Sequence, residues 1–253
     1  MYAPERHRLI VDRVSAGGRA SVNDLATALK VTPETIRRDL TELEKQGLVR
    51  RVHGGAIPVR RIGFQPTVEV RGAVRIDEKT RIAEAALEEV PLEGAIIVDS
   101  RTTTGRLVSM LPHDRELTVV TNSVQHAIAL ANWENIRMFL LGGRVRGRTL
   151  ACVDSWAIAA LKDVVADVAF IGVGGISVEH GLTTRNRAEA EIKAAMMLAA
   201  KRKVVMADSS KFGAGHFAHF ADVKDIDVIV SDSDLDDEIG EQLRGAGPSV
   251  VLA

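Results

Sequence analysis

The sequence is short of cysteine, of long apolar runs and of net charge, and each shortage excludes a class of protein. Its 253 residues include one cysteine, Cys152, which cannot form a disulfide within the chain and is typical of a reducing compartment. Charges interrupt the apolar residues of the N-terminal segment, so it does not resemble a signal peptide, and no apolar run is long enough to span a bilayer. We therefore expect a cytoplasmic protein with no membrane partner.

The composition is that of an ordinary globular protein, with 46% hydrophobic and 26% charged residues. These values exclude collagen, low-complexity disorder and a disulfide scaffold. At about 100–200 residues per domain, the length predicts one or two domains, each large enough to bury a core.

The formal net charge of −1 argues at first against a nucleic-acid partner, but its distribution along the chain does not. Residues 1–60 hold 11 Lys and Arg against 7 Asp and Glu, a balance of +4, while residues 61–253 hold 22 against 27, a balance of −5. Chance fluctuation between segments of this size is one explanation. The other is a small basic domain and a larger acidic domain with different tasks.

The beginning of the chain carries the signals of three helices. A helical pattern over residues 4–15 is followed by a second, short helix that begins with a capping box at Ser21. Thr32 is a good N-cap and Pro33 a good first residue for a third helix, which ends near Gly47. Two short helices joined by a tight turn predict a DNA-binding helix-turn-helix domain.

Hydroxyl and arginine side chains lie outside the apolar stripe of the third helix. An arginine there can bind phosphate or recognise guanine, and the sequence leaves both roles open. Asp39 is expected to form a local ion pair and not to contact DNA, because phosphate repels a carboxylate. Alternating apolar and basic residues after Gly47 predict a two-stranded wing that contacts phosphates. A three-helix domain with a solvated basic face is the alternative. The predicted DNA-binding residues are Ser21, Thr32, Thr35, Arg37, Arg38, Thr41, Arg50, Arg51 and His53.

A linker and an α/β domain are predicted for the rest of the chain. Residues 58–75 mix proline, glycine and arginine without a sustained period, which separates a DNA-binding domain of residues 1–57 from a domain of residues 76–253. Beyond Pro91, short apolar runs alternate with helical stretches, as in a largely parallel sheet. The predicted strands are 95–98, 117–121, 137–141, 168–172, 203–207 and 228–231, with a further short one at 249–252.

Polar loops follow five of these strands. Because parallel sheets bind ligands at the carboxyl ends of their strands, loops rich in Gly, Ser, Thr, Asn, Arg and Lys would surround one crevice. Each loop alone is explained by a capped helix or a tight turn. Their recurrence favours a shared anion site, which suits a small phosphorylated polyol better than an apolar ligand.

The chain resembles the DeoR-type bacterial transcriptional regulators over nearly its whole length. The N-terminal run that carries the likeness is SVNDLATALKVTPETIRRDLTELEKQGLVRRVHGGA. In the second domain the similar segments are DSRTTT, VTNS, LGGRVR, FIGVGGIS, GLTTRNRAEAEIKAAM and MADSSKFG. The resemblance implies a winged helix-turn-helix domain and a larger α/β effector domain with the fold of ribose-5-phosphate isomerase and CoA-transferase. It also implies a sugar-phosphate effector.

The strand-end loops and the resemblance together predict the effector site. At one position the chain departs from the family, which usually has Gly in place of Arg101. Glycine there lets the backbone approach a phosphate closely, so Arg101 either adds a charged contact or crowds the loop, and we expect an altered choice of effector. The predicted effector-binding residues are Asp99, Ser100, Arg101, Thr102, Thr103, Asn122, Ser123, Gly142, Gly143, Gly172, Lys193, Asp208 and Lys211.

We predict a repressor of carbohydrate or polyol genes that a phosphorylated sugar releases from its operator. A single DNA-binding domain offers few phosphate contacts, so a homodimer or higher oligomer on double-stranded DNA is expected. No cofactor or metal is predicted, because His216 and His219 would supply only half a metal site. One alternative is a sugar-phosphate isomerase with a basic appendage, whose acid–base groups would be Glu189, Glu191, Lys193 and Asp208. Another is a second domain that serves only oligomerisation.

Overall fold

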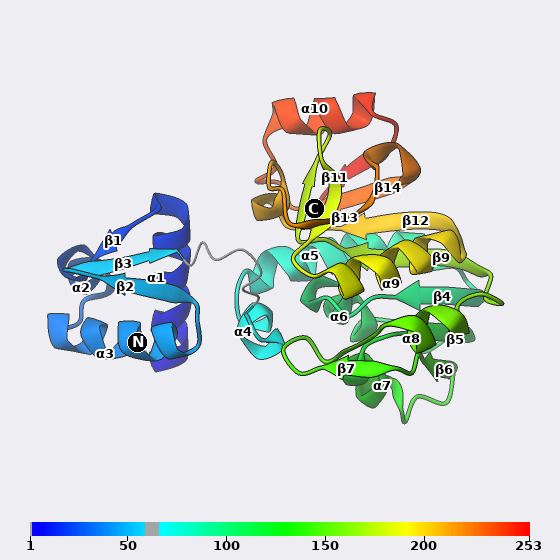
Figure 1. The fold of residues 1–253 in the computed structure, drawn as a ribbon, viewed down its shortest axis with the longest axis horizontal. Helices are drawn as coiled ribbons and strands as arrows, with labels where there is room; N and C mark the ends of the chain where they lie inside the picture. The colour runs from blue at the N-terminus through cyan, green and yellow to red at the C-terminus, as the bar shows by residue number, and fades with distance from the viewer. Residues whose placement is uncertain (1, 59–65) are drawn as a thin grey trace. The chain divides into compact units, whose positions relative to one another are not determined.

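The computed structural model describes residues 2–58 and 66–253 and divides the chain into two compact units. The first is Met1–Val74 and the second is Arg75–Ala253 (Figure 1). The architecture confirms the expected fold class: helices with a small antiparallel sheet in the first unit, and a larger α/β unit built on a parallel sheet.

Part of the predicted linker is helical. Residues 59–65 lie outside the described residues, so the limits of the linker stay a prediction. After them, α4 (Val68–Gly72) forms a helix where the sequence predicts none. Five residues are too few to establish a helical period, which is why the pattern does not reveal it.

Residues 2–58 form three helices and a three-stranded antiparallel sheet of order β1-β3-β2. Ser21 and Thr32 cap the second and third helices as predicted, because the hydroxyl of each accepts a hydrogen bond from the backbone N–H three residues further on. The elements are α1 (Ala3–Gly17), β1 (Ala20–Ser21), α2 (Val22–Leu29), α3 (Pro33–Lys45), β2 (Val49–Val52) and β3 (Gly55–Pro58). The largest core side chains are Ile10, Leu25, Ile36, Leu40 and Leu43.

The wing has three strands rather than the two that the sequence predicts. The extra strand, β1, pairs with β3 so that Ala20 lies opposite Ala56. Gly55 permits this pairing, because a Cβ atom at that position would lie 2.1 Å from the carbonyl oxygen of Ala20. Gly54 has a φ of +79° and makes the turn between β2 and β3. Two residues are too short a strand to leave an alternating pattern, so β1 is missed from sequence.

The larger unit is built on a seven-stranded sheet of order β15-β14-β12-β9-β4-β5-β6, with every neighbouring pair parallel. All seven predicted strands are present, with ends shifted by up to three residues. They are β4 (Gly94–Val98), β5 (Leu117–Thr121), β6 (Ile136–Leu140), β9 (Ala166–Gly172), β12 (Ala200–Met206), β14 (Val228–Ser231) and β15 (Ser249–Leu252).

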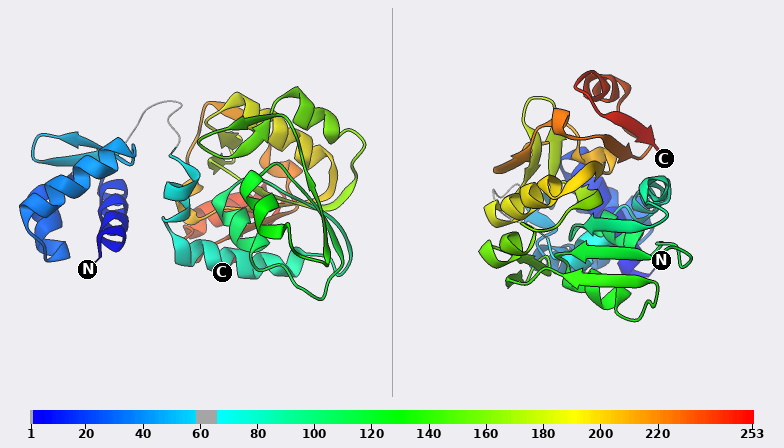
Figure 2. Two further views of the ribbon diagram at one scale, coloured as in Figure 1. Left: turned by 90° about the horizontal axis from the view of Figure 1, so that it is seen from below. Right: turned by 90° about the vertical axis from the view of Figure 1, so that its right-hand side faces the viewer.

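Helices cover both faces of this sheet (Figures 1 and 2). In β4, Ile96 packs into one core with residues of α5, α6 and α7, whereas its neighbour Ile97 packs into the other core with residues of α8, α9 and α10. Burial on both faces explains why the strands are continuous apolar runs. The helices are α5 (Ile76–Ala86), α6 (Thr102–Val108), α7 (Val124–Leu130), α8 (Ser155–Ala160), α9 (Arg187–Leu198) and α10 (Asp237–Gly245), with short 3₁₀ turns η1 (Leu87–Glu89), η2 (Ser209–Lys211) and η3 (Val223–Asp225).

Two further sheets in this unit have no counterpart in the sequence prediction. One is the antiparallel sheet of order β10-β11-β13, and the other is the β7–β8 hairpin. Their strands have three or four residues each, which is too short for a reliable alternation of apolar and polar residues. The bounds are β7 (Arg144–Arg146), β8 (Ala151–Val153), β10 (Gly175–Ser177), β11 (Gly181–Thr184) and β13 (Ala218–Ala221). Across the parts of the chain that are described, no helix is both long enough and apolar enough to cross a membrane.

Candidate nucleic-acid interface and ligand site

Helix α3 packs one face into the core and exposes the opposite face. Ile36 and Leu40 are fully buried, while Arg37 and Arg38 between them are exposed. The Arg37 guanidinium donates to the carboxylate of Glu34 at 3.2 Å, and more than half of its side chain is exposed. An exposed ion pair of this kind is weak, so it leaves the guanidinium available to a phosphate or a base edge.

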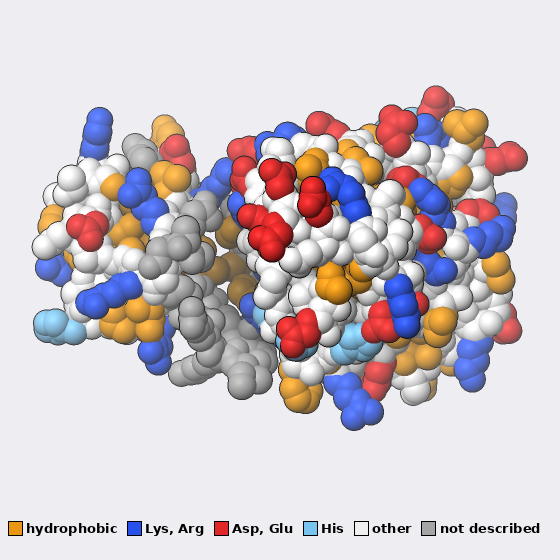
Figure 3. All heavy atoms as spheres, turned by 90° about the horizontal axis from the view of Figure 1, so that it is seen from above, with side chains coloured by type: hydrophobic (Ala, Val, Ile, Leu, Met, Phe, Trp, Pro, Cys, Tyr) orange, Lys and Arg blue, Asp and Glu red, His pale blue; other side chains and the backbone are white. Residues whose placement is uncertain are grey.

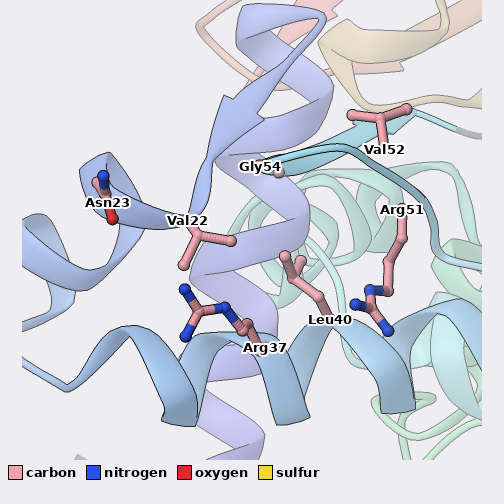
Figure 4. Close-up of a pocket in the computed structure, with 8 residues that line it drawn as sticks. Val22, Asn23, Arg37, Leu40, Arg51, Val52 and Gly54 are labelled. Carbon is pink, nitrogen blue, oxygen red and sulfur yellow. The ribbon is translucent and has the colours of Figure 1, made fainter.

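The wing brings a second guanidinium to the same face of the unit. Arg51 of β2 donates to the Thr41 hydroxyl at 2.8 Å, and its backbone N–H donates to Glu44, so the wing is tied to α3. Figure 4 shows Arg37 rising from α3 and Arg51 descending from the wing, with Leu40 between them. They border a hollow of about 190 Å³, lined by Val22, Asn23, Arg37, Leu40, Arg51, Val52, Gly54 and Gly55.

The other predicted DNA-binding residues divide into two groups. The hydroxyls of Ser21 and Thr32 cap helices, and that of Thr32 also lies 2.9 Å from the Thr35 hydroxyl. Arg38, Arg50 and His53 are exposed. Asn23 lines the hollow and is absent from the sequence prediction, because a single exposed amide on a short helix carries no distinguishing signal.

Asp39 forms an ion pair, but its partners lie on α1 and not close by in the sequence, where a local pair was predicted. Its carboxylate accepts hydrogen bonds from Arg6 Nη2 at 2.9 Å and from the His7 ring at 2.9 Å. Burial alone would raise the pKa of Asp39, but the bonds from Arg6 and His7 hold it below its ordinary value. Asp39 therefore fixes α3 against α1, and its carboxylate lies buried.

In the larger unit, Asp99 and Lys193 form a buried ion pair between the ends of β4 and β9. The two oxygens of Asp99 also accept hydrogen bonds from the N–H groups of Arg101 and Gly172, at 3.1 and 3.0 Å, and from the Thr104 hydroxyl at 2.8 Å. Lys193 donates to the Gly172 carbonyl at 2.8 Å. Burial lowers the pKa of Lys193, and the Asp99 charge opposes that shift. Through these contacts the ion pair fixes the loops that follow β4 and β9, and it forms the floor beneath them.

The Arg101 side chain extends from the loop after β4 to residues of α9 and β11. Its guanidinium donates to the Thr184 hydroxyl at 2.7 Å and lies 3.7 Å from the Glu189 carboxylate, which Arg146 of β7 also contacts. Glu189 is buried and accepts a further bond from Thr184 at 3.3 Å. The sequence prediction omits Arg146, Thr184 and Glu189 from the effector site. All three lie within the family-like segments LGGRVR and GLTTRNRAEAEIKAAM, and Glu189 is also an acid–base candidate of the isomerase alternative.

The loop after β5 is buried, and not all of its polar side-chain atoms have hydrogen-bond partners. Asn122 donates from Nδ2 to the Cys152 carbonyl at 3.1 Å, while its Oδ1 is buried without a hydrogen-bond partner. Ser123 caps α7 by accepting from the backbone N–H of His126. Burial lowers the pKa of His126 to about 4, so this imidazole is neutral near pH 7.

The loop after β12 gathers charges around Asp208. This buried carboxylate lies 3.3 Å from the Lys211 ammonium and 3.4 Å from the Arg75 guanidinium. Burial would raise the pKa of Asp208, and the neighbouring cations lower it below its ordinary value. Arg75 also donates to the Ser209 hydroxyl at 2.9 Å and to Glu78 at 3.2 Å. Arg75, which the prediction leaves in the linker, is thus part of this loop's charge cluster.

Among the remaining predicted positions, Ser100 and Thr103 are buried, and Thr102 is the first residue of α6. Gly142 and Gly143 lead from β6 into β7, whose Arg146 is the residue that reaches Glu189. His216 bonds the Gly174 carbonyl, and His219 bonds Asp222. Within residues 2–58 and 66–253, no group of three His, Cys, Asp or Glu side chains is placed to hold a metal ion.

Comparisons with known proteins cover both units. Residues 6–61 match the DeoR-like helix-turn-helix domain, and residues 74–233 match the DeoR C-terminal sensor domain. The HTH-type transcriptional regulator GlpR of Haloferax volcanii is 38% identical over 99% of this chain and 98% of its own length. The HTH-type transcriptional repressor GlcR of Bacillus subtilis is 33% identical over 92% and 89%.

Likenesses to solved structures are weaker. Ribose 5-phosphate isomerase A from Methanocaldococcus jannaschii is 16% identical with a TM-score of 0.41, covering 54% of each chain. The full-length sorbitol operon regulator SorC from Klebsiella pneumoniae is 13% identical with a TM-score of 0.37, covering 82% of this chain and 90% of that one. Both scores are too low to bear on function.

Proposed function

The chain belongs to the DeoR family of helix-turn-helix transcriptional regulators, and from this premise we propose that a phosphorylated sugar or polyol releases it from its operator. We further propose that it represses genes of carbohydrate or polyol metabolism. The observation that carries the proposal is the combination of an exposed arginine surface in one unit with charged loops at the strand ends of the other. The family membership confirms the resemblance expected from the sequence.

The charge of each unit supports this division of tasks. Residues 1–74 hold 13 Lys and Arg against 8 Asp and Glu, a balance of +5, and residues 75–253 hold 20 against 26, a balance of −6. On the face shown in Figure 3, Lys and Arg outnumber acidic side chains on the smaller unit, while both signs are mixed on the larger one. Phosphate attracts the first unit and repels the second, so we propose that the smaller unit alone contacts DNA.

Three features of the larger unit support a phosphorylated polyol ligand. Lys211, whose side chain is about one-third exposed, offers a cation for the phosphate next to the hydroxyl of Ser210, which it contacts at 2.8 Å. The unpartnered Oδ1 of Asn122 offers an acceptor for a ligand hydroxyl. The ion pair of Asp99 and Lys193 holds the loops after β4 and β9 in place, through the N–H groups of Arg101 and Gly172 and the Gly172 carbonyl.

Three finer statements belong to the same proposal. Paired operator half-sites require two DNA-binding units, so we propose a homodimer or higher oligomer on double-stranded DNA. Ligand binding is proposed to occur without turnover, because Asp99 and Glu189 are already engaged by basic side chains. We also propose a cytoplasmic location, where the protein would reach its operator.

A binding experiment on the full chain tests the proposal. The chain is expected to bind a DNA fragment from upstream of its own gene at fixed salt, and a phosphorylated sugar is expected to weaken that binding at least tenfold. A ligand at 100 times its Kd adds about 2.7 kcal/mol of stability, which raises the Tm of a domain of this size by roughly 5–10 °C. Thermal shift over a panel of sugar and polyol phosphates measures this effect.

The matched controls are the unphosphorylated sugars. They are expected to leave both Tm and operator affinity unchanged. No Tm shift with any phosphorylated compound would contradict an effector site and favour a domain that serves only oligomerisation. Chemical conversion of the bound compound, detected by NMR, would favour the alternative of a sugar-phosphate isomerase.

Arg75 is the residue we propose to link the ligand loop to the DNA-binding unit. It is the first residue of the larger unit and adopts a left-handed conformation with φ of 53°, which costs of order 1 kcal/mol or more for a residue other than glycine. Contacts to Asp208, Ser209 and Glu78 hold it there. A ligand phosphate that binds Lys211 competes with Asp208 for that cation and so alters the charge that Arg75 faces.

Replacing Arg75 by glycine is expected to uncouple ligand from operator. Glycine accepts the left-handed backbone but lacks the guanidinium, so ligand affinity stays within about threefold while the ligand effect on operator Kd falls from tenfold or more to about twofold. Fluorescence anisotropy with labelled operator, with and without the compound that raised Tm most, measures it. Arg75→Lys, which keeps the charge, serves as the control. An unchanged ligand effect in Arg75→Gly would show that the signal takes another route.

A further inference from the structure

Arg101 occupies the middle of the proposed effector site. Its side chain is 13% exposed, and its Cβ and Cγ lie against Gly172 at the end of β9. A Cβ atom at position 172 would lie 2.6 and 2.5 Å from those two atoms, so only glycine allows the arginine to pass. The side chain therefore fills space at the carboxyl ends of β4 and β9, where a ligand of a parallel sheet binds.

The Arg101 guanidinium is incompletely neutralised in this position. Its nearest carboxylate, Glu189, stands at 3.7 Å, beyond hydrogen-bond distance, and makes its close contact with Arg146 instead. The Arg101 charge also contributes to lower pKa values at Lys193 and Arg185, after burial as the main cause at each. A largely enclosed guanidinium with no carboxylate within hydrogen-bond distance gains most from a second anion that can bind it directly.

We propose that Arg101 makes this a site for phosphorylated sugar acids, compounds that carry a carboxylate in addition to the phosphate. This inference rests on the proposed effector site and names the class of ligand. The planar guanidinium fork matches a carboxylate with two parallel hydrogen bonds, whereas a polyol hydroxyl leaves the charge unneutralised.

The two ends of such a ligand fit different parts of the site. Arg101 is the more enclosed cation, and Glu189 approaches it only to 3.7 Å, so the smaller, planar carboxylate of the ligand belongs there. Lys211 is about one-third exposed and lies on the loop after β12, where a bulkier tetrahedral phosphate has room. The ligand carboxylate would then complete the coordination of Arg101 that Glu189 leaves open.

Two pairs of compounds isolate the carboxylate. 6-Phosphogluconate and sorbitol 6-phosphate have the same carbon skeleton and differ in the oxidation of C1, and 3-phosphoglycerate and glycerol 3-phosphate form the equivalent three-carbon pair. Charge-assisted hydrogen bonds are stronger than bonds to a neutral hydroxyl, so the wild-type chain is expected to bind the acid of at least one pair about 10- to 100-fold more tightly. Isothermal titration calorimetry on the full chain gives both Kd values.

Arg101→Ala is expected to reduce that preference to less than about threefold, mainly by raising the Kd of the acid. Arg101→Lys keeps the charge without the fork, and an intermediate preference is expected; it also tests the idea if the alanine variant folds poorly. The matched control is Arg202→Ala, which removes a half-exposed arginine paired with Glu89 and is expected to keep the wild-type preference.

The outcomes separate this inference from the proposed function. If none of these compounds binds and no sugar or polyol phosphate of the thermal-shift panel raises Tm, the effector site itself is contradicted. If another phosphate raises Tm but neither acid binds, the site exists and the preference for a sugar acid is overturned. If the polyol phosphates bind as tightly as the acids, or if Arg101→Ala weakens both members of a pair equally, the site exists and the preference for a sugar acid is overturned.

Discussion

Replacing Arg37 and Arg38 together by alanine is expected to weaken specific operator binding by roughly 100-fold or more. Each arginine contact to a base or phosphate is worth about 1–3 kcal/mol, and the proposed oligomer would lose each contact in every bound DNA-binding unit. Both side chains are exposed on α3 while the core face of the helix is untouched, so the unit is expected to fold normally. Anisotropy titration at one fixed salt concentration measures the loss.

The matched control removes two other exposed arginines from the same unit, Arg13 and Arg19. This variant has the same net charge, so a loss of less than about fivefold would show that position rather than total charge matters. Equal losses in the two double variants, or no loss in the first, would contradict α3 as the recognition helix.

The single variants then separate the two roles that the sequence leaves open. Loss of a phosphate contact weakens binding to all sequences about equally and lowers the slope of log Kd against log salt concentration by about one. Loss of a base contact relaxes discrimination at one position of the operator. Arg37 borders the hollow shared with the wing, so we expect it to differ from Arg38 in this test.

Replacing Asp99 by alanine is expected to lower the free energy of unfolding of the larger unit by about 3–5 kcal/mol. The change leaves the Lys193 ammonium buried without its counter-charge and removes the acceptor for the N–H groups of Arg101 and Gly172. The corresponding fall in Tm is roughly 10 °C. Urea unfolding followed by circular dichroism, together with a thermal melt, measures the loss.

A double variant provides the control for this prediction. Asp99→Leu with Lys193→Met removes both charges, so no uncompensated ion stays buried, and its loss is expected to be smaller than the sum of the two single variants. Additive losses would contradict a coupled pair. A loss below about 1 kcal/mol in Asp99→Ala would show that the buried pair is not the floor of the site.

The sequence by itself determined the kind of each unit. Caps such as Ser21 and Thr32 act within one helical turn, and the apolar runs of the sheet record burial on both faces, so both are visible in a single chain. The long composite signature around α3 likewise identified the family, and charge counted by segment located the basic unit.

Elements shorter than about five residues were not accessible in this way. Strand β1 exists because Gly55 lets it approach β3, and the sheet β10-β11-β13 joins segments about 40 residues apart. Helix α4 has too few residues to show a period. The short strands are stabilised by strands elsewhere in the chain, and a local pattern contains no record of such partners.

The arrangement of the candidate effector site was decided only by the tertiary structure. The sequence indicated that Arg101 departs from the family, but not that it passes over Gly172 to reach Thr184 and Glu189. It also left Arg75 in a linker, although the fold places it against Asp208. Sequence patterns carry the interactions of neighbours along the chain, whereas a ligand site is made of charges that long-range strand pairing brings within a few ångströms of one another.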